Sequence, residues 1–296
     1  MRMPVFTGAG VAIATPFKNG NIDFDTFEKL IEFQIKNGTD AIIVCGTTGE
    51  SATLKDPEHL DAINFCVERT AGRAKVIAGT GSNDTMHALD FSVRAEEMGA
   101  DGLLLVTPYY NKTSQRGLVN HFRYIADRVN IPMILYNVPS RTGLSFTAES
   151  YAALAEHPMI NGVKEASGNF TLMLKTRSLC PDDFYIWSGN DDQIVPVMAL
   201  GGKGIISVAS NIIPAEIVKI SHLCLEGKYE QAAELQVKYG DLIEKLFIET
   251  NPIPVKAAMD MMGLCSGELR MPLYEISPEN REKLRAAMLN AGLAVR

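Results

Sequence analysis

Segments of two kinds alternate along most of the chain. Amphipathic segments, with apolar residues at helical spacing, end near a glycine, and a short run that is apolar throughout follows, as in 37–45, 98–106 and 202–208. Glycine readily adopts the left-handed conformation that ends a helix. A short, continuously apolar run is typical of a strand covered on both faces in a parallel sheet. The pattern therefore predicts helices that alternate with parallel strands.

Eight of the apolar runs fit such strands, and helical segments lie between them. We predict strands over about Val11–Thr15, Ala41–Cys45, Lys75–Ala78, Gly102–Val106, Met133–Tyr136, Gly162–Lys164, Phe184–Ser188 and Gly204–Val208. The helical segments include Asp25–Lys36, Pro57–Thr70, Thr85–Met98, Arg116–Arg128 and Ala148–Glu156, with Asp25 and Thr147 as N-caps and Pro57 in a first turn. Eight such units in tandem predict an α/β fold, a (β/α)8 TIM barrel. A doubly wound open sheet is the alternative, but no GxGxxG motif follows the first strand.

The chain after Gly227 shows helical segments only. They cover Tyr229–Thr250, Pro254–Met262 and Pro278–Ala291, and the prolines of Asn251-Pro-Ile-Pro254 separate the first two. We therefore predict two regions: a catalytic barrel over residues 1–226 and a C-terminal helical extension over residues 227–296.

Composition narrows the class of protein. The chain has 296 residues, 46% of them hydrophobic and 21% charged, and its net charge of −7 makes nucleic acid and anionic membranes poor partners. The five cysteines form no CxxC pair and the five histidines no HExxH motif, so we expect reduced thiols and neither a metal nor a cofactor. No signal-peptide core or bilayer-length apolar run is present. These features predict a soluble cytoplasmic protein.

The residues that follow the predicted strands would share one mouth of the barrel, where ligands bind. The sixth strand ends on Lys164, and an amine shielded there by apolar neighbours can attack a carbonyl carbon to form a Schiff base. A lysine that simply leaves a strand for water is the alternative for this stretch alone. Gly46-Thr-Thr-Gly-Glu-Ser51 adds hydroxyls and backbone amides that suit an anion, and Tyr136-Asn-Val-Pro-Ser-Arg141 adds a phenol and a guanidinium. One amine, one phenol, several hydroxyls and one arginine suit carbonyl chemistry through an imine.

Three further strand exits contribute to this mouth. The aromatic pair in Thr107-Pro-Tyr-Tyr-Asn111 is more typical of packing than of chemistry. The acidic residues of Ser188-Gly-Asn-Asp-Asp192 argue against a phosphate there. The last strand, with Ile205-Ile-Ser207, offers backbone groups to a ligand.

Several of these motifs together resemble a known family. Gly46-Thr-Thr-Gly-Glu50, Tyr109-Tyr110, Tyr136-Asn-Val-Pro139 and Lys164-Glu-Ala-Ser-Gly-Asn169 are similar to the pyruvate-dependent class I lyases related to N-acetylneuraminate lyase. Ser140-Arg-Thr-Gly143, together with Asn251–Lys256 and Leu269–Leu273, narrows the resemblance to the dihydrodipicolinate synthase family. It covers essentially the whole chain. It implies a (β/α)8 barrel with a helical tail, usually a homotetramer of two tight dimers, that condenses pyruvate with aspartate 4-semialdehyde for diaminopimelate and lysine biosynthesis.

The resemblance implies a role for each matching residue. Lys164 would form the Schiff base with pyruvate, and Tyr136 would move protons in a relay with Thr47 and with Tyr110, which reaches in from the neighbouring subunit. The substrate-binding residues would be Thr48 and the Ile206 backbone for pyruvate, Arg141 for the semialdehyde carboxylate, and Gly189 beside the lysine.

The resemblance also implies an effector site, from which this chain departs. In lysine-inhibited relatives, residues that match Ser51, Ala52, His59, Asn83 and Tyr109 bind lysine. A glutamate stands where this chain has His87, and a histidine where it has Asp56. Because a histidine of ordinary pKa is mostly neutral at pH 7, it cannot replace the charge of the glutamate. We therefore expect weak or absent feedback inhibition by lysine.

Two alternatives to the synthase remain open on the sequence. A sugar-acid aldolase of the same superfamily is one, but such enzymes generally lack an arginine at the position of Arg141. A catalytically silent, pyruvate-binding barrel is the other, and the intact set of lysine, tyrosine and threonines counts against it.

Overall fold

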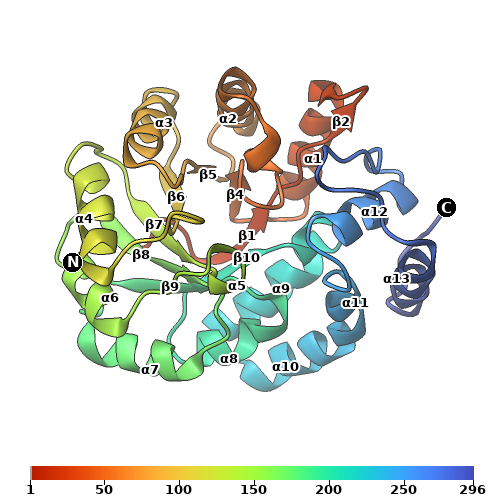
Figure 1. Ribbon diagram of the computed structural model, residues 1–296. Helices are drawn as coiled ribbons and strands as arrows, with labels where there is room; N and C mark the ends of the chain where they lie inside the picture. Colours follow the sequence, from red (N-terminus) through yellow and green to blue (C-terminus); the bar gives the residue numbers. More distant parts are fainter. Residues whose placement is uncertain (1) are drawn as a thin grey trace.

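The computed structural model describes residues 2–296 and shows a closed barrel of parallel strands. Around the barrel the order is β1-β10-β9-β8-β7-β6-β5-β4, and each neighbouring pair is parallel (Figure 1). The strands are β1 (Gly8–Ala12), β4 (Ala41–Val44), β5 (Lys75–Gly79), β6 (Gly102–Val106), β7 (Met133–Asn137), β8 (Ile160–Glu165), β9 (Tyr185–Ser188) and β10 (Gly204–Ser207). The predicted (β/α)8 barrel is confirmed.

The first strand is the one whose position we predicted wrongly. It covers Gly8–Ala12 and not Val11–Thr15, because the sequence Gly-Ala-Gly carries little β propensity and hides the start of the strand. Small residues are needed there: a Cβ on Gly10 would lie 2.6 Å from Ile43 Cδ1 and 2.9 Å from Phe6 Cζ. Phe6 in turn stacks on Trp187 with ring centroids 5.3 Å apart, inside the barrel.

Helices follow the strands and cover the outside of the barrel. They are α1 (Phe24–Lys36), α2 (Asp56–Thr70), α3 (Thr85–Glu97), α4 (Gln115–Ala126), α6 (Ala148–Ala155), α7 (Phe170–Leu179), α8 (Ile194–Ala199) and α9 (Pro214–Leu225). Thr147 caps α6 by accepting from the Ser150 amide, and Pro57 lies in the first turn of α2, both as predicted. The N-cap of α1 is Asp23 and not Asp25, because the Asp23 carboxylate accepts from both the amide and the hydroxyl of Thr26.

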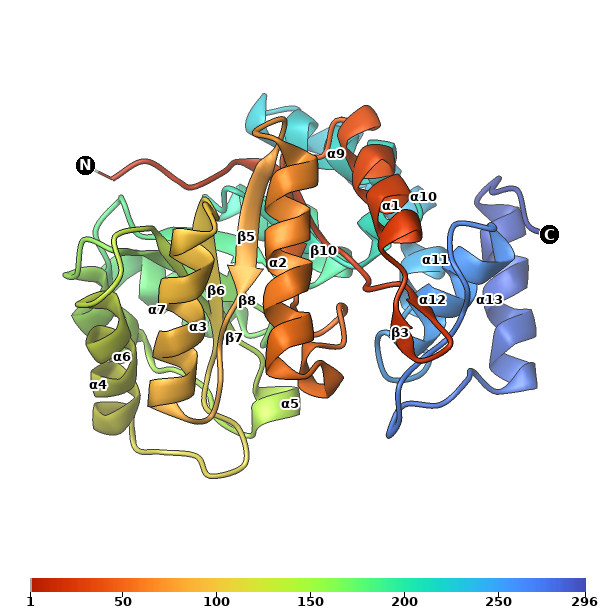
Figure 2. The same cartoon turned by 90° about the horizontal axis from the view of Figure 1, so that it is seen from above.

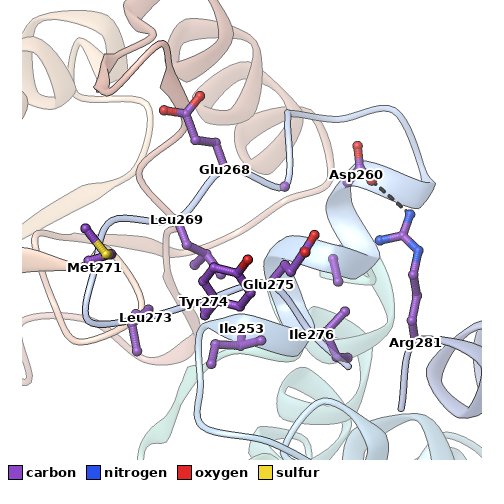
Figure 3. A pocket seen from close by; sticks show the side chains of 12 residues that line it. Ile253, Asp260, Glu268, Leu269, Met271, Leu273, Tyr274, Glu275, Ile276 and Arg281 are labelled. Atoms are coloured by element: carbon purple, nitrogen blue, oxygen red, sulfur yellow. Dashed lines mark hydrogen bonds and ion pairs between the residues drawn. The ribbon is translucent and has the colours of Figure 1, made fainter. Parts of the chain in front are cut away.

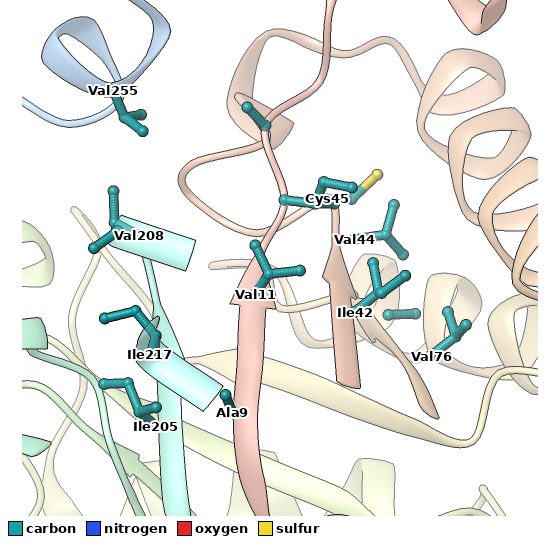
Figure 4. Close-up of a cluster of buried hydrophobic side chains, with 14 of the residues drawn as sticks. Ala9, Val11, Ile42, Val44, Cys45, Val76, Ile205, Val208, Ile217 and Val255 are labelled. Atoms are coloured by element: carbon teal, nitrogen blue, oxygen red, sulfur yellow. The ribbon is translucent and has the colours of Figure 1, made fainter. Parts of the chain in front are cut away.

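The buried apolar side chains form two layers, one inside the barrel and one between the strands and the helices. The inner one fills the barrel and includes Phe6, Tyr136, Trp187 and Ile206. The outer one joins the strands to the helices, and Figure 4 shows part of it around β1, β4 and β10. Along each strand, side chains alternate between these layers.

The C-terminal region is helical, as predicted, but its first helix is divided. The helices are α10 (Tyr229–Lys238), α11 (Gly240–Lys245), α12 (Ile253–Met261) and α13 (Pro278–Asn290). They lie beside the barrel, where α10 packs on α9 and α13 packs on α11 and α12 (Figure 2). The division of the chain at residue 227 stays a prediction, since α10 packs directly on α9.

The structure also contains short elements that the pattern did not predict. The strands β2 (Phe17–Lys18) and β3 (Asn21–Ile22) form a hairpin, and α5 (Pro139–Thr142) follows β7. Among residues 2–296, no helix has both the length and the apolar character that a membrane span requires.

Candidate active site

Lys164 and Tyr136 lie side by side inside the carboxyl-terminal end of the barrel. They are paired in the register of β8 with β7, and only 5% and 7% of their surfaces are exposed. The Lys164 Nζ atom lies 4.3 Å from the centroid of the Tyr136 ring. The structure therefore brings together the predicted amine and phenol in a largely desolvated place, where a carbonyl carbon could meet both.

Asp191 is a buried carboxyl near Lys164. Its oxygens accept from the Ser207 hydroxyl and from the amides of Val208 and Ala209, at 2.9 and 3.1 Å for the two amides. Burial raises the pKa of Asp191, while its hydrogen bonds and the charge of Lys164 act in the opposite direction. Asp191, in the acidic stretch after β9, thus holds the turn after β10 in place. The sequence pattern did not indicate this contact.

The loop after β4 places Thr47 and Thr48 at the mouth of the barrel. Thr48 is buried, and its Oγ1 accepts from Asn251 Nδ2 at 2.9 Å. The Gly49 and Glu50 amides donate to carbonyls within the loop. Across residues 2–296, in contrast, the amides of Thr47 and Thr48 have no protein acceptor. These two amides and the hydroxyls beside them suit the carboxylate of a small acid.

Glu50 in the same loop is tied to the C-terminal region. Its carboxylate accepts from Lys256 Nζ at 2.5 Å and from the Arg270 amide at 3.0 Å. The side chains of Glu50 and Lys256 are both fully buried, and Phe17 covers the lysine with its ring centroid 4.2 Å from Nζ. Burial lowers the pKa of Lys256, and the Glu50 charge opposes that shift. The C-terminal helices thereby hold the loop that carries both threonines.

Arg141 approaches the same loop from α5. Its Nη2 donates to the backbone oxygen of Asn251 at 3.0 Å, so Asn251 contacts both Arg141 and Thr48. Within residues 2–296, the Asn251 side-chain oxygen is buried without a hydrogen-bond partner. Such an oxygen is a candidate acceptor for a ligand donor.

A cavity of about 480 Å³ opens above this site. Thr47, Arg141 and Asn251 are among the residues that line it. Its walls reach Val106 and Val138, but Tyr136 and Lys164 lie inside the barrel and do not line it. A cavity of this size suits a small-molecule ligand.

The same cavity reaches most of the predicted effector residues. Ser51, Ala52, His59, His87 and Tyr109 line it, together with Asp56. The structure does not place Asn83 among them: its backbone oxygen accepts from Asn111 Nδ2 instead. His59 Nε2 lies 2.8 Å from the Gly79 oxygen, and burial lowers the pKa of that imidazole. His87 Nε2 lies 3.3 Å from Asp56 Oδ1.

Three other predicted residues have different settings. Ile206 is fully buried on β10 in the inner apolar layer. A Cβ on Gly189 would lie 2.6 Å from the Ala166 Cβ, so the ends of β9 and β8 are in close contact beside Lys164. Tyr110 is 92% exposed, with a positive φ of 68°, and this single chain does not bring it to Tyr136.

A second cavity, of about 500 Å³, lies in the C-terminal region (Figure 3). Apolar side chains such as Ile253, Leu273 and Ile276 line it, together with Arg281 and Asp260, which form an ion pair at 3.0 Å (Figure 3). None of the predicted site residues lines this cavity.

The fold and the site together define a class: a (β/α)8 barrel with a lysine at the end of a strand, where enzymes of this fold carry their chemistry. The chain belongs to the dihydrodipicolinate synthetase family, whose model matches residues 5–291.

Relatives and solved structures match nearly the whole length of the chain. The chain is 53% identical to 4-hydroxy-tetrahydrodipicolinate synthase of Caldicellulosiruptor saccharolyticus over 99% of this chain and 100% of the relative. The crystal structure of dihydrodipicolinate synthase from Aquifex aeolicus is 47% identical, with a TM-score of 0.97 over 98% of this chain and 100% of that one. The chloride-inhibited synthase from Acinetobacter baumannii, complexed with pyruvate, is 40% identical, with a TM-score of 0.95 over 97% and 99%.

Proposed function

We propose that the protein is a 4-hydroxy-tetrahydrodipicolinate synthase, a lyase that condenses pyruvate with L-aspartate 4-semialdehyde through a Schiff base on Lys164. The observation that carries the proposal is the buried contact between Lys164 and Tyr136, 4.3 Å from Nζ to ring centroid. Full-length relatives with this activity support it.

The chemistry follows from an amine and a phenol at one carbonyl. The neutral amine of Lys164 attacks the ketone carbon of pyruvate, water leaves, and an iminium forms. The iminium draws electrons from the neighbouring methyl group, which loses a proton to give an enamine. The enamine carbon then attacks the aldehyde carbon of the second substrate, which forms the carbon–carbon bond, restores the iminium and leaves a hydroxyl once the aldehyde oxygen is protonated. The amino group of the semialdehyde then adds to the iminium carbon and displaces Lys164, so that the ring closes and the free lysine returns. Tyr136 moves the protons of these steps.

The groups around the pair suit the two carboxylates. We assign the pyruvate carboxylate to Thr48, to the free amides of Thr47 and Thr48, and to the backbone at Ile206. We assign the carboxylate of the semialdehyde to Arg141, which lines the cavity.

The covalent step is tested by incubating the protein with pyruvate, reducing with borohydride and mapping the modified peptide. We expect one label, on Lys164. A label on another lysine, or none in an active preparation, contradicts the mechanism. Efficient cleavage of N-acetylneuraminate would instead favour the sugar-acid aldolase.

Replacing Arg141 by alanine should weaken the semialdehyde far more than pyruvate. A lost charge-assisted hydrogen bond is worth about 1.5–3 kcal/mol, or roughly 10- to 150-fold in kcat/KM. Initial rates with each substrate varied in turn measure the difference. Arg128→Ala is the matched control, since Arg128 lies over the Tyr124 ring away from the cavity. Equal losses for both substrates would give Arg141 a general structural role.

By the resemblance, Tyr110 is expected to act in the neighbouring subunit of a homodimer, within a homotetramer, and its 92% exposure in the single chain is consistent with this role. The test mixes two variants, Tyr110→Ala and Lys164→Arg, each with little activity alone. If Tyr110 acts across an interface, mixed dimers contain one site with both natural residues, and activity returns. If the subunits exchange but the mixture stays inactive, the proposal is contradicted. It is contradicted as well if the protein sediments as a monomer and is fully active.

Lysine is expected to inhibit weakly. We propose that Ser51, Ala52, His59, His87 and Tyr109, which line the cavity, form a weakened effector site in which Asp56 is engaged with His87. Asn83 belongs to this proposed site by the resemblance alone, since it does not line the cavity. Loss of one charge pair with a bound ammonium costs about 1.5–3 kcal/mol, or one to two decades of affinity. A lysine titration at pH 7.5 measures this, and His87→Glu should raise the sensitivity. Half-inhibition of the unaltered protein below millimolar lysine would refute the idea.

A further inference from the structure

A second pair of side chains lies directly behind Lys164 and Tyr136. Asn137 and Glu165 are the next residues on β7 and β8, and they too are paired in the register of the two strands. Because side chains alternate along a strand, this second pair faces the helices while the first pair faces the inside of the barrel. Consistent with this, Glu165 reaches Tyr151 on α6, whose ring belongs to the outer apolar layer.

The Glu165 carboxylate is buried and its hydrogen bonds are fully satisfied. Asn137 Nδ2 donates to both of its oxygens, at 3.0 and 3.1 Å, Tyr151 OH donates to one at 2.9 Å, and the Ser167 amide to the other at 2.8 Å. Asn137 and Tyr151 are themselves fully buried. Burial and the Glu165 charge raise the pKa of Tyr151 far above its usual value, so its hydroxyl keeps the proton that it donates.

A buried carboxylate is an unusual way to join a strand to a helix. Removing its hydration is costly, and an apolar contact of similar volume would stabilise the layer at least as well. Unlike an apolar contact, the carboxylate forms hydrogen bonds that are directional, and each bond fixes the position of one element. The donors come from β7 (Asn137), from α6 (Tyr151) and from the loop after β8 (Ser167). These elements include the strand ends that carry Tyr136 and Lys164.

We propose that Asn137, Glu165 and Tyr151 form a positioning bracket that fixes the ends of β7 and β8 and so sets the geometry of Tyr136 and Lys164. The bracket residues do not touch the substrate. This inference rests on the proposed function, since it assigns the bracket to imine formation on Lys164. A displacement of about 1 Å between reacting groups costs on the order of 100-fold in rate.

The experiment measures the rate of imine formation with pyruvate alone. Samples are quenched with borohydride at increasing times, and the label on Lys164 is quantified per folded protein. We expect Glu165→Gln to slow the reaction by about 10- to 100-fold and Tyr151→Phe by roughly 3- to 10-fold, with the same final labelling. Tyr185→Phe is the matched control, because its hydroxyl bonds the Arg2 backbone away from the site, and its rate should not change. Variants that melt earlier but label at the natural rate would overturn the bracket.

A reversal of polarity provides the second measurement. Asn137→Asp alone sets a carboxylate against the Glu165 carboxylate and should be the slowest variant. Asn137→Asp combined with Glu165→Gln exchanges donor and acceptor and keeps the charge, so it should label faster than either single variant. If the labelling rate of the double variant falls by the product of the two single effects, the proposal is overturned. If the natural protein labels at Lys164 and the variants match it, only the bracket fails. If the natural protein forms no Lys164 adduct, the proposed function fails and the bracket with it.

Discussion

Replacing Lys164 by arginine is expected to leave the barrel folded and to reduce turnover by roughly 10⁴- to 10⁶-fold, as when the nucleophile of a covalent mechanism is lost. The guanidinium group is delocalised and permanently protonated, so it cannot add to the ketone of pyruvate. The measurement is kcat in a coupled assay, together with the borohydride-trapped adduct, which should disappear. Circular dichroism establishes that the variant is folded.

Lys75→Arg is the matched control for this variant. Lys75 begins β5, at the opposite end of the barrel, and pairs with Asp101 at 2.6 Å on the surface. Its replacement should leave kcat unchanged. A folded Lys164→Arg protein with a substantial share of natural turnover would exclude the Schiff-base mechanism.

Tyr136→Phe should retain the adduct but lose about 10²- to 10⁴-fold in turnover, the range for a positioned acid–base group.

Replacing Lys256 by methionine is expected to lower the free energy of unfolding by about 3–5 kcal/mol, because it leaves the Glu50 charge buried without its partner. Both side chains are fully buried, and among residues 2–296 only the Arg270 amide, at 3.0 Å, remains as a donor to Glu50. Activity should fall as well, since Glu50 belongs to the loop that carries Thr47 and Thr48. Urea unfolding measures the first effect and the KM for pyruvate the second.

Two further variants make this prediction specific. Lys283→Met removes an exposed i,i+4 ion pair with Glu279 and should change the stability by less than about 1 kcal/mol. The double variant Glu50→Gln with Lys256→Met removes both charges and should be more stable than Lys256→Met alone. A double variant that loses the sum of the two single effects would show that the ion pair contributes nothing specific.

The local pattern of residues was enough to predict the architecture and the neighbouring positions of Lys164 and Tyr136. Seven of the eight strands lie where their continuous apolar runs predict, because burial on both faces leaves a local signal that needs no knowledge of distant residues. The exception is β1, whose Gly-Ala-Gly start lacks that signal. That Lys164 and Tyr136 lie side by side was also predictable, since residues at the ends of parallel strands meet at one rim of a barrel.

The surroundings of Lys164 and Tyr136 depend on contacts between residues that are far apart in the sequence. Glu50 meets Lys256 across 206 positions of sequence, and Asn251 meets Thr48 across 203. No periodicity connects residues so far apart, because their contact depends on how the C-terminal helices pack beside the barrel. The bracket behind Lys164 and Tyr136 was hidden for a different reason: a buried carboxylate in a strand looks like any polar residue until its donors, one of them on α6, are placed around it. Burial of apolar side chains leaves a periodic pattern in the sequence. Which polar groups hydrogen-bond to each other, in contrast, depends on how the helices and strands pack.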